Sequence, residues 1–374
     1  MKRKLISEAH IESNELRFVE SAFRKNQLSL FGQNLNAFEN DLKHYLKESL
    51  HVACLSSGTA AIHLALVQLG ISLNDEVICQ TFTFSATANP IIYQGATPVF
   101  VDSETETWNM CPVHLETAIK DRIAKGKIPK AIIVVHLYGM PAKVDELLAV
   151  ANKYNIPVVE DAAEALGSTY KGRKCGTFGD YSILSFNGNK IITTSGGGAM
   201  VCNTEEKKKN TIFLATQARD QAPHYEHSQI GYNYRMSNIC AGIGRGQMEV
   251  LDKHIALRRS MNAFYIEIFK DIEGVTVFTE SNQDVFSNHW LSCILIGENA
   301  PFSKDEFYNK MLEANIKTRP LWKPMHLQPI FSNAPYYGDN VSETLFENGL
   351  CLPSGSNLLQ EDRDRIFKVI ESLK

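Results

Sequence analysis

The chain contains 374 residues, of which 44% are hydrophobic and 21% are charged, a length and composition typical of a soluble enzyme with two domains. Its formal net charge of −4 excludes a general electrostatic attraction to nucleic acid or to an anionic membrane. The basic N-terminus is not followed by an apolar segment, and no apolar run approaches the ~20 residues of a membrane span, so we expect a cytoplasmic protein with no membrane partner.

Short apolar segments rich in Val and Ile alternate with helical patterns between about residues 50 and 200. The predicted strands are His51–Leu55, Glu76–Cys79, Thr97–Val101, Ala131–Val135, Pro157–Glu160 and Tyr181–Leu184. Amphipathic stretches such as Val144–Tyr154 lie between several of them. This alternation predicts an α/β fold with a mostly parallel sheet flanked by helices. Ligands of such sheets bind at the carboxyl ends of the strands.

The C-terminal third of the chain predicts a second unit. Gln247–Asp271 has the pattern of one long helix, preceded by Gly242-Ile-Gly244-Arg-Gly246, whose glycines favour close helix packing over a dinucleotide site. A strand pattern at Trp290–Ile296 and a closing helix near Asp362–Leu373 follow. We expect a large domain at residues 1–250 and a smaller C-terminal α/β domain at residues 251–374.

Small polar residues follow the first predicted strand. Gly58 and Thr59 lie in a Ser/Gly/Thr turn that opens a strongly helical segment ending at Leu66. The free backbone N–H groups and the positive end of the helix dipole suit a phosphate. An ordinary helix N-cap accounts for the same residues.

Two further strands are followed by candidate ligand-binding side chains. Phe84 comes after the second strand and could stack on a planar ligand or belong to the core. Asp161 comes after the fifth strand, where an unpaired carboxylate is costly to desolvate and needs a cation. A protonated pyridine nitrogen, Lys190 or an arginine could supply the positive charge.

Lys190 lies in the segment Ser185-Phe-Asn-Gly-Asn-Lys190, followed by the glycines 196–198. The order of residues excludes a phosphate-binding P-loop, in which the glycines precede the lysine. A Schiff-base lysine, an anion-binding lysine and a solvated turn residue remain. Together with a phosphate turn, an aromatic ring and a carboxylate, however, the lysine forms a set that fits pyridoxal 5′-phosphate (PLP). Ser185 would then offer a further hydroxyl to the phosphate.

At this point the chain resembles the DegT/DnrJ/EryC1/StrS family of PLP-dependent sugar aminotransferases, which have fold type I. Four motifs occur in the family's order: Ser57-Gly58-Thr59, Glu160-Asp161-Ala-Ala, Ser185-Phe-Asn-Gly-Asn-Lys190 and Gly231-Tyr-Asn-Tyr-Arg235. Further segments resemble the UDP-sugar 4-aminotransferases that make UDP-N-acetylbacillosamine: Thr216-Gln-Ala-Arg219, His224-Tyr-Glu-His227, Arg319-Pro-Leu-Trp-Lys323 with Met325-His326, and Cys351-Leu-Pro-Ser-Gly355.

The resemblance implies a role for each matching residue. Lys190 forms the Schiff base with PLP, and Asp161 pairs with the pyridinium nitrogen. The other cofactor-binding residues are Gly58, Thr59 and Ser185 at the phosphate, Phe84 on the ring, Glu164 near the phenolic oxygen, and Asn233, which reaches the cofactor of the neighbouring subunit. The substrate-binding residues are Asn26, Gln27, Leu28, Ser29, Arg319 and His326. A homodimer with shared active sites follows from the implied role of Asn233.

Two features depart from the family's pattern. Many members read Gly-Glu-Gly-Gly after the lysine, where this chain has Ser195-Gly196-Gly197-Gly198, which puts one loop contact in doubt. Many members have glutamine where this chain has Glu164, and an ionised glutamate there would repel the phenolic oxygen unless it is protonated or turned away. No metal is expected, because the His224 and His227 pair lacks a strong third ligand in the sequence.

The resemblance implies transfer of an amino group from L-glutamate to C4 of a UDP-linked 4-keto-6-deoxy-N-acetylhexosamine. Two alternatives remain open from the sequence. The acceptor could be another 4-keto-6-deoxy nucleotide sugar, such as a GDP-perosamine or legionaminic-pathway precursor. The chain could also be a non-catalytic regulatory protein on the same fold, although Lys190 and Asp161 are both present and argue against this.

Overall fold

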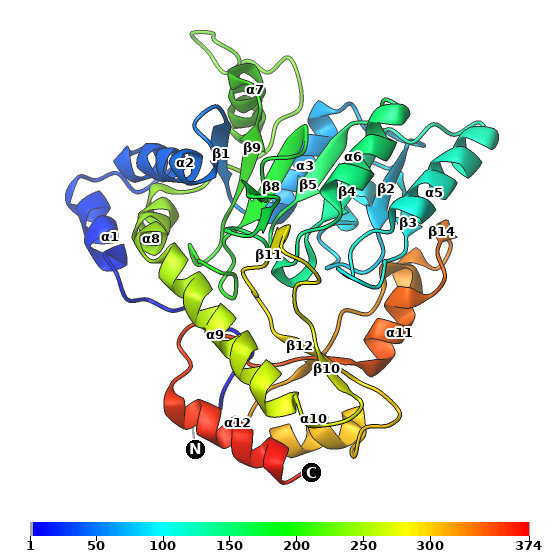
Figure 1. Ribbon diagram of the computed structural model, residues 1–374. Coiled ribbons are helices and arrows are strands. Elements are labelled where there is room, and N and C mark those ends of the chain that lie inside the picture. Colours follow the sequence, from blue (N-terminus) through cyan, green and yellow to red (C-terminus); the bar gives the residue numbers. More distant parts are fainter. Residues whose placement is uncertain (1–2, 374) are drawn as a thin grey trace.

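The computed structural model describes residues 3–373, and its largest element is an eight-stranded sheet (Figure 1). In spatial order the strands are β1 (His51–Leu55), β9 (Gly198–Cys202), β8 (Tyr181–Ser185), β5 (Val158–Asp161), β4 (Ala131–Val135), β2 (Glu76–Gln80), β3 (Thr97–Val101) and β14 (Tyr336–Tyr337). Every pair from β8 to β14 is parallel, and β9 alone runs antiparallel to its neighbours. The predicted α/β class with a mostly parallel sheet is confirmed.

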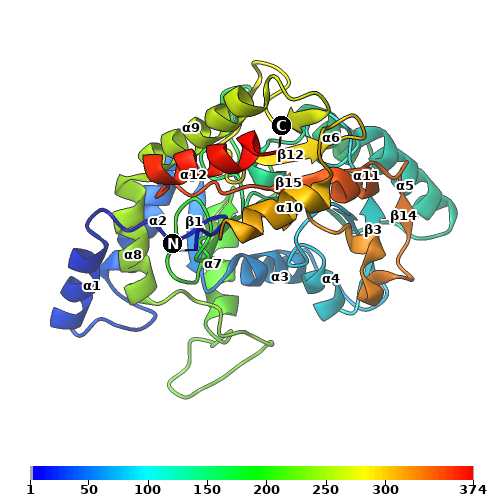
Figure 2. The same ribbon diagram turned by 90° about the horizontal axis from the view of Figure 1, so that it is seen from below.

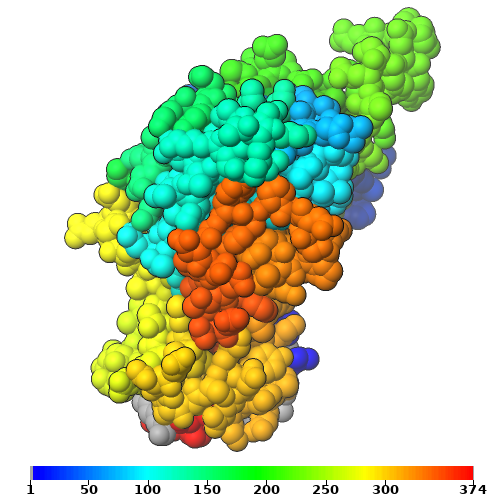
Figure 3. Space-filling view, turned by 90° about the vertical axis from the view of Figure 1, so that its right-hand side faces the viewer, coloured from blue at the N-terminus to red at the C-terminus, as the bar shows by residue number. Residues whose placement is uncertain are grey.

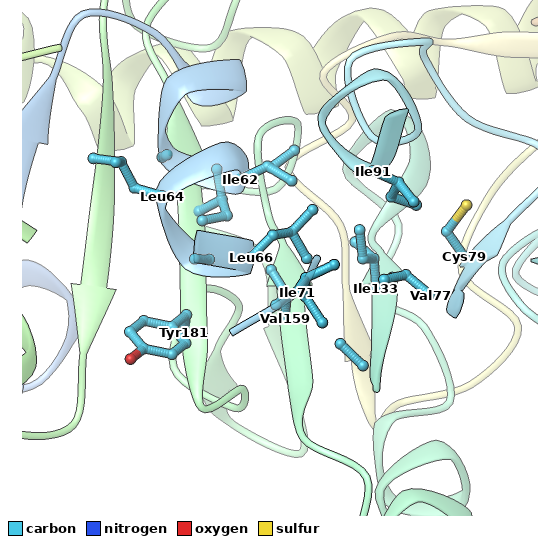
Figure 4. Close-up of a cluster of buried hydrophobic side chains, with 14 of the residues drawn as sticks. Ile62, Leu64, Leu66, Ile71, Val77, Cys79, Ile91, Ile133, Val159 and Tyr181 are labelled. Atoms are coloured by element: carbon cyan, nitrogen blue, oxygen red, sulfur yellow. The ribbon is translucent and has the colours of Figure 1, made fainter. Parts of the chain in front are cut away.

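Helices cover both faces of this sheet (Figure 1). Those packed against it are α3 (Gly58–Gln68), α4 (Asn89–Tyr93), α5 (Pro112–Ala124), α6 (Val144–Lys153) and α7 (Glu205–Ala215). Successive side chains of a strand point to opposite faces, so Val77 of β2 packs with α3 whereas Ile78 packs with α5. Figure 4 shows Ile62 and Leu66 of α3 facing the strands. Because both faces are buried, the central strands are continuously apolar instead of alternating.

A helical layer closes the β1 side of the sheet. It consists of α1 (Glu15–Arg24), α2 (Gln33–Leu46) and α8 (Asn238–Glu249), and apolar side chains of α2 and α8 share one cluster with β1 and β9. The glycines of α8 permit close packing, because a Cβ on Gly244 would lie 2.6 Å from the ring of Phe38.

The prediction of one continuous helix over Gln247–Asp271 is wrong at its N-terminal end. Gln247 belongs to α8, which begins after Ser237, whose side chain caps it by accepting from the N–H of Cys240. Val250 leaves helical geometry with φ −120° and ψ 7°, and a separate helix, α9 (Leu251–Phe269), follows.

A second, four-stranded sheet lies below the first. Its strands in order are β10 (Val275–Val277), β12 (Cys293–Ile296), β15 (Gly349–Cys351) and β13 (Arg319–Pro320). It packs with α9, α10 (Lys304–Glu313), α11 (Val341–Asn348) and α12 (Gln360–Glu371) (Figure 2). The remaining elements are a small sheet of β11 (Val285–Phe286), β6 (Thr169–Tyr170) and β7 (Arg173–Lys174), and the 3-10 helices η1 (Leu137–Gly139), η2 (Met325–Leu327) and η3 (Pro329–Phe331).

Two segments of the chain connect the two sheets. Strand β14 lies in the part of the chain predicted to form the C-terminal domain, yet it joins the edge of the large sheet beside β3. Near the N-terminus, Lys4 forms a bridge to Ile316, which shortly precedes β13 of the four-stranded sheet. The cavity described below is bordered by segments from both sheets, because β13 of the second sheet carries Arg319.

The chain after α7 forms a loop that projects from the body of the molecule, green in Figures 1 and 3. The apolar side chains of Tyr225 and Ile230 on this loop are 78% and 81% exposed. Across residues 3–373, no helix is both long enough and apolar enough to cross a membrane.

Candidate active site

A cavity of about 380 Å³ opens where the carboxyl ends of β1, β5 and β8 meet. Eight residues predicted from the sequence line it: Gly58, Thr59, Phe84, Asp161, Glu164, Ser185, Lys190 and Arg319. They come together because parallel strands end on the same edge of a sheet, and β13 of the second sheet brings Arg319 to the rim.

The end of the cavity below α3 is a ring of small residues around free N–H groups. Ser57 caps α3, its Oγ accepting from the N–H of Ala60 at 3.0 Å. The N–H groups of Gly58 and Thr59 have no hydrogen-bond partner among residues 3–373. A Cβ on Gly198 would collide with the backbone nitrogen of Gly58, so glycine is needed where β9 begins. The helix-cap and anion-site interpretations of this turn are therefore compatible, because the N–H of Ala60 serves the cap while those of Gly58 and Thr59 are left for an anion.

Asp161 is the last residue of β5 and is only 5% exposed. Its carboxylate accepts from Thr87 Oγ1 at 2.8 Å and from the N–H of Ala163 at 3.2 Å. Burial raises the pKa of this carboxyl above its ordinary value, although both donors and the positive charge of Lys190 oppose the rise. A cation in the cavity would relieve this cost of burial.

Lys190 extends from the loop between β8 and β9 into the same cavity, and its side chain is 11% exposed. The Nζ atom lies 3.4 Å from Oε1 of Glu164 and 4.2 Å from the centre of the Trp290 ring. Trp290 is fixed in turn by its indole N–H, which donates to the carbonyl of Asn189 at 2.7 Å. The lysine is thus held between a carboxyl group and an aromatic face.

Glu164 is buried and is held from its other side. Its Oε2 accepts from the N–H of Tyr138 at 2.7 Å, and the backbone of Tyr138 has φ of 56°, in the left-handed region. Burial raises the pKa of the Glu164 carboxyl, and the charge of Lys190 opposes that rise.

The outer wall of the cavity is aromatic. Phe84, 50% exposed, packs on Trp322 with ring centroids 5.4 Å apart. The guanidinium of Arg319 lies 5.9 Å from the Trp322 ring, and the N–H of Trp322 donates to the phenol oxygen of Tyr138 at 2.9 Å. Flat apolar faces beside a cation suit a heterocycle or a sugar ring.

The structure does not bring every predicted residue to this cavity. His326 bonds Thr81 Oγ1 at 2.7 Å and stacks on Tyr336 with centroids 3.9 Å apart, outside the lining. Asn233 lies exposed at the base of the loop after α7, paired with Thr216. Asn26, Gln27, Leu28 and Ser29 also lie outside the lining, in the turn between α1 and α2.

Sequence reasoning missed Trp290, Trp322 and Thr87. Trp290 lies in an apolar stretch that predicts only a strand, and Thr87 lies among other small residues. Trp322 belongs to the motif Arg319-Pro-Leu-Trp-Lys323, but nothing in that motif indicates that its ring faces Phe84.

The residues present fit PLP. The cofactor requires three features of a protein: an amine, here Lys190; a buried carboxylate, here Asp161, which has no ion-pair partner within residues 3–373; and free N–H groups, here those of Gly58 and Thr59. The absence of a side chain at Gly198 lets β9 lie against the backbone of Ser57 and Gly58, where the free N–H groups are.

Comparison with known proteins agrees with this donor set. The model of the DegT/DnrJ/EryC1/StrS aminotransferase family matches residues 9–371. The chain belongs to this family. DegT-family aminotransferases use PLP, and the protein is accordingly a PLP-dependent sugar aminotransferase of nucleotide-sugar pathways.

Individual relatives within the DegT family match nearly the whole chain. EpsN of Bacillus subtilis is 46% identical over 99% of this chain and 95% of its own. The GDP-perosamine synthase of Escherichia coli O157:H7 is 37% identical over 100% and 98%. The UDP-4-amino-4,6-dideoxy-N-acetyl-beta-L-altrosamine transaminase of Campylobacter jejuni is 30% identical over 98% of each chain. Among solved structures, Spr1654 of Streptococcus pneumoniae in its PLP form has a TM-score of 0.90 at 26% identity, covering 100% of each chain.

Proposed function

We propose that the protein transfers the amino group of L-glutamate to C4 of a UDP-linked 4-keto-6-deoxy-N-acetylhexosamine, the reaction of a bacillosamine-type pathway. The observation that carries the proposal is the cavity in which Lys190 and Asp161 lie together beside the free N–H groups of α3. Family membership supports transfer to a sugar, and the motifs shared with UDP-sugar 4-aminotransferases support the nucleotide and the position.

PLP, when bound, supplies an aldehyde carbon that accepts and passes on the amino group and a pyridine ring that takes up negative charge. Lys190 is the residue that would hold the aldehyde. Asp161 would keep a proton on the pyridine nitrogen, because its carboxylate is buried and without an ion-pair partner. The N–H groups of Gly58 and Thr59, with the hydroxyl of Ser185, would hold the phosphate.

Lys190 also moves the protons of the reaction. In the first half its free amine takes the proton from the α-carbon of glutamate, and in the second half it gives a proton to C4 of the sugar. The Trp290 face and the low exposure of the side chain keep water away from the amine. Phe84 and Trp322 offer apolar faces for the cofactor ring and the sugar.

We further propose a homodimer in which each active site uses residues of both chains. Asn233 and the turn at residues 26–29 lie outside the cavity of their own chain, as a contribution to a second site requires. The exposed Tyr225 and Ile230 on the projecting loop offer apolar area for such an interface. Arg319 at the rim of its own cavity would face the substrate from the other side.

A GDP-linked 4-keto-6-deoxy sugar is the second candidate acceptor, favoured by the 37% identity to a GDP-perosamine synthase. A substrate panel separates the two. Purified protein with PLP and L-glutamate is offered each UDP- and GDP-linked 4-keto-6-deoxy sugar, and formation of 2-oxoglutarate and of the amino sugar is measured. We expect the highest kcat/KM for the UDP-linked N-acetyl sugar. A higher value for a GDP sugar would replace the substrate assignment, and no 2-oxoglutarate with any acceptor would refute the function.

A further inference from the structure

Lys190 is the one cation in direct contact with a carboxyl inside the cavity, among residues 3–373. Two carboxyl groups, Asp161 and Glu164, lie in the same lining, and both are buried. Only Glu164 touches the lysine, at 3.4 Å from Oε1 to Nζ. Whether the Lys190 nitrogen can react therefore depends on which of these groups holds the proton.

A lysine must lose a proton before its nitrogen can react with an aldehyde, and few routes are open to the proton. The Lys190 side chain is largely buried, and the Trp290 ring covers it at 4.2 Å. An aromatic face attracts the ammonium but cannot accept its proton. Of the two groups in contact with the amine within residues 3–373, the Trp290 ring and the Glu164 carboxyl, only the carboxyl can accept the proton.

Of the two carboxyl groups, Asp161 is the less suited. Its oxygens are occupied by Thr87 and by the N–H of Ala163, and a proton on Asp161 would abolish its interaction with a pyridinium. Glu164 has one oxygen held by the N–H of Tyr138 and the other directed at the lysine. Its second oxygen is thus free to take a proton without breaking a hydrogen bond to the backbone.

We propose that Glu164 takes the proton that Lys190 gives up when the lysine joins the cofactor, and holds it while the cofactor is attached. The proposal rests on Lys190 being the cofactor lysine, as proposed above. Glu164 acts through Lys190, by setting the charge of its amine. The role also removes the repulsion expected between an ionised Glu164 and the phenolic oxygen of PLP, because the carboxyl is neutral while the cofactor is attached.

The step balances as a proton transfer followed by a condensation. The ammonium of Lys190 and the carboxylate of Glu164 become an amine and a carboxylic acid. The amine then adds to the aldehyde, a carbon–nitrogen double bond forms, and the aldehyde oxygen leaves as water, with no net oxidation or reduction. Burial raises the pKa of the Glu164 carboxyl, which strengthens it as a base.

Other titratable groups around Glu164 do not compete for this proton. Asp161 faces it across the cavity, and the phenol of Tyr138 is engaged by the N–H of Trp322. The thiol of Cys293 lies behind Tyr138, and burial raises its pKa well above the ordinary value. The pH dependence of cofactor attachment is therefore assigned to the Glu164 carboxyl.

The test uses the full chain freed of cofactor, without glutamate or sugar. The rate of covalent PLP attachment is followed by absorbance against pH, and binding of pyridoxine 5′-phosphate, which has no aldehyde, is measured separately. Glu164→Gln should attach PLP about 10²-fold more slowly at neutral pH, after the rate is corrected for any change in affinity measured with pyridoxine 5′-phosphate. The deficit should narrow as the pH is raised, because hydroxide can then take the proton in place of the carboxylate.

Two further variants separate proton transfer from structural damage. Glu164→Ala should regain attachment with added formate, which can enter the space of the lost carboxyl, whereas Glu164→Gln should not. Thr87→Val, the matched control, loosens Asp161 and should weaken pyridoxine 5′-phosphate binding without changing the pH profile of attachment.

A Glu164→Gln profile equal to that of wild type would overturn the proposal, as would the same shift in Thr87→Val. PLP attachment to Lys190→Ala would overturn the assignment of the lysine itself. Failure to aminate a keto sugar would refute the proposed function alone, because no sugar takes part in this test.

Discussion

Replacing Asp161 with asparagine should have opposite effects on the protein without and with its cofactor. Without PLP the carboxyl is buried with only two hydrogen bonds, and burial raises its pKa. The folded chain then binds more protons than the unfolded chain between the two pKa values, so the free energy of unfolding falls as pH rises through that window. An asparagine side chain does not titrate, so Asp161→Asn should stabilise the apoprotein at neutral pH.

The magnitudes follow from what the substitution removes. Asparagine loses the charge and keeps only one of the two accepting oxygens, because Thr87 donates to Oδ2 and the N–H of Ala163 donates to Oδ1. If its oxygen serves Ala163, its amide N–H can donate to the Thr87 hydroxyl, and removing the buried charge should then stabilise the apoprotein by about 1 kcal/mol. In the loaded protein the substitution removes the anionic half of a buried pair with the pyridinium, at a cost of about 3–5 kcal/mol. At about 1.4 kcal/mol per tenfold, affinity should fall by two to three and a half orders of magnitude.

The assay combines denaturant unfolding of the apoprotein across pH with titration of pyridoxamine 5′-phosphate, which keeps the ring nitrogen but has no aldehyde for Lys190. The stability difference between Asp161→Asn and wild type should vanish in acid, below the ordinary aspartate pKa of ~3.9. An asparagine variant that is less stable than wild type at neutral pH, or that binds the ligand equally well, would refute the reasoning.

Three other substitutions test the surroundings of the site. Ser57→Ala removes the cap of α3 and should lower the free energy of unfolding by about 1 kcal/mol, measured by thermal unfolding. An unchanged stability would contradict the role of the cap. Gly198→Ala should displace the N–H of Gly58 and weaken PLP binding measured by titration. Gly188→Ala, at a position outside the cavity lining where a Cβ meets only the Ser195 carbonyl at 3.9 Å, should bind normally. Glu160→Gln takes the charge from a buried carboxylate that bonds His136 at 2.9 Å, and should cost about 3–5 kcal/mol in denaturant unfolding; a cost below about 1 kcal/mol would contradict this account.

Much of the large sheet could be predicted from the sequence because its strands are short, apolar and buried on both faces. His51–Leu55, Thr97–Val101 and Ala131–Val135 are strands with those bounds. Residues that directly follow or end such strands, such as Asp161, must gather at one edge, so their meeting in a cavity is a consequence of topology.

Contacts made by distant segments could not be predicted in the same way. Trp290 reaches Lys190 only because the second sheet packs below the first, and no local pattern encodes that approach. The end of the helix at Val250 could not be predicted either, because the apolar periodicity of the sequence continues past Val250 while the backbone leaves helical geometry there. The 3.4 Å contact between Glu164 and Lys190 depends on the left-handed turn at Tyr138, which the sequence around it does not signal.

The most direct test of the central claim is a single-turnover measurement on the PLP-loaded protein. Addition of L-glutamate should change the cofactor absorbance and release one 2-oxoglutarate per site, and UDP-4-keto-6-deoxy-N-acetylglucosamine should then restore the absorbance and yield one 4-amino sugar. Lys190→Ala should show neither change. A wild-type protein whose absorbance responds to glutamate but is restored by no keto nucleotide sugar, or a Lys190→Ala variant that completes both halves, would contradict the account.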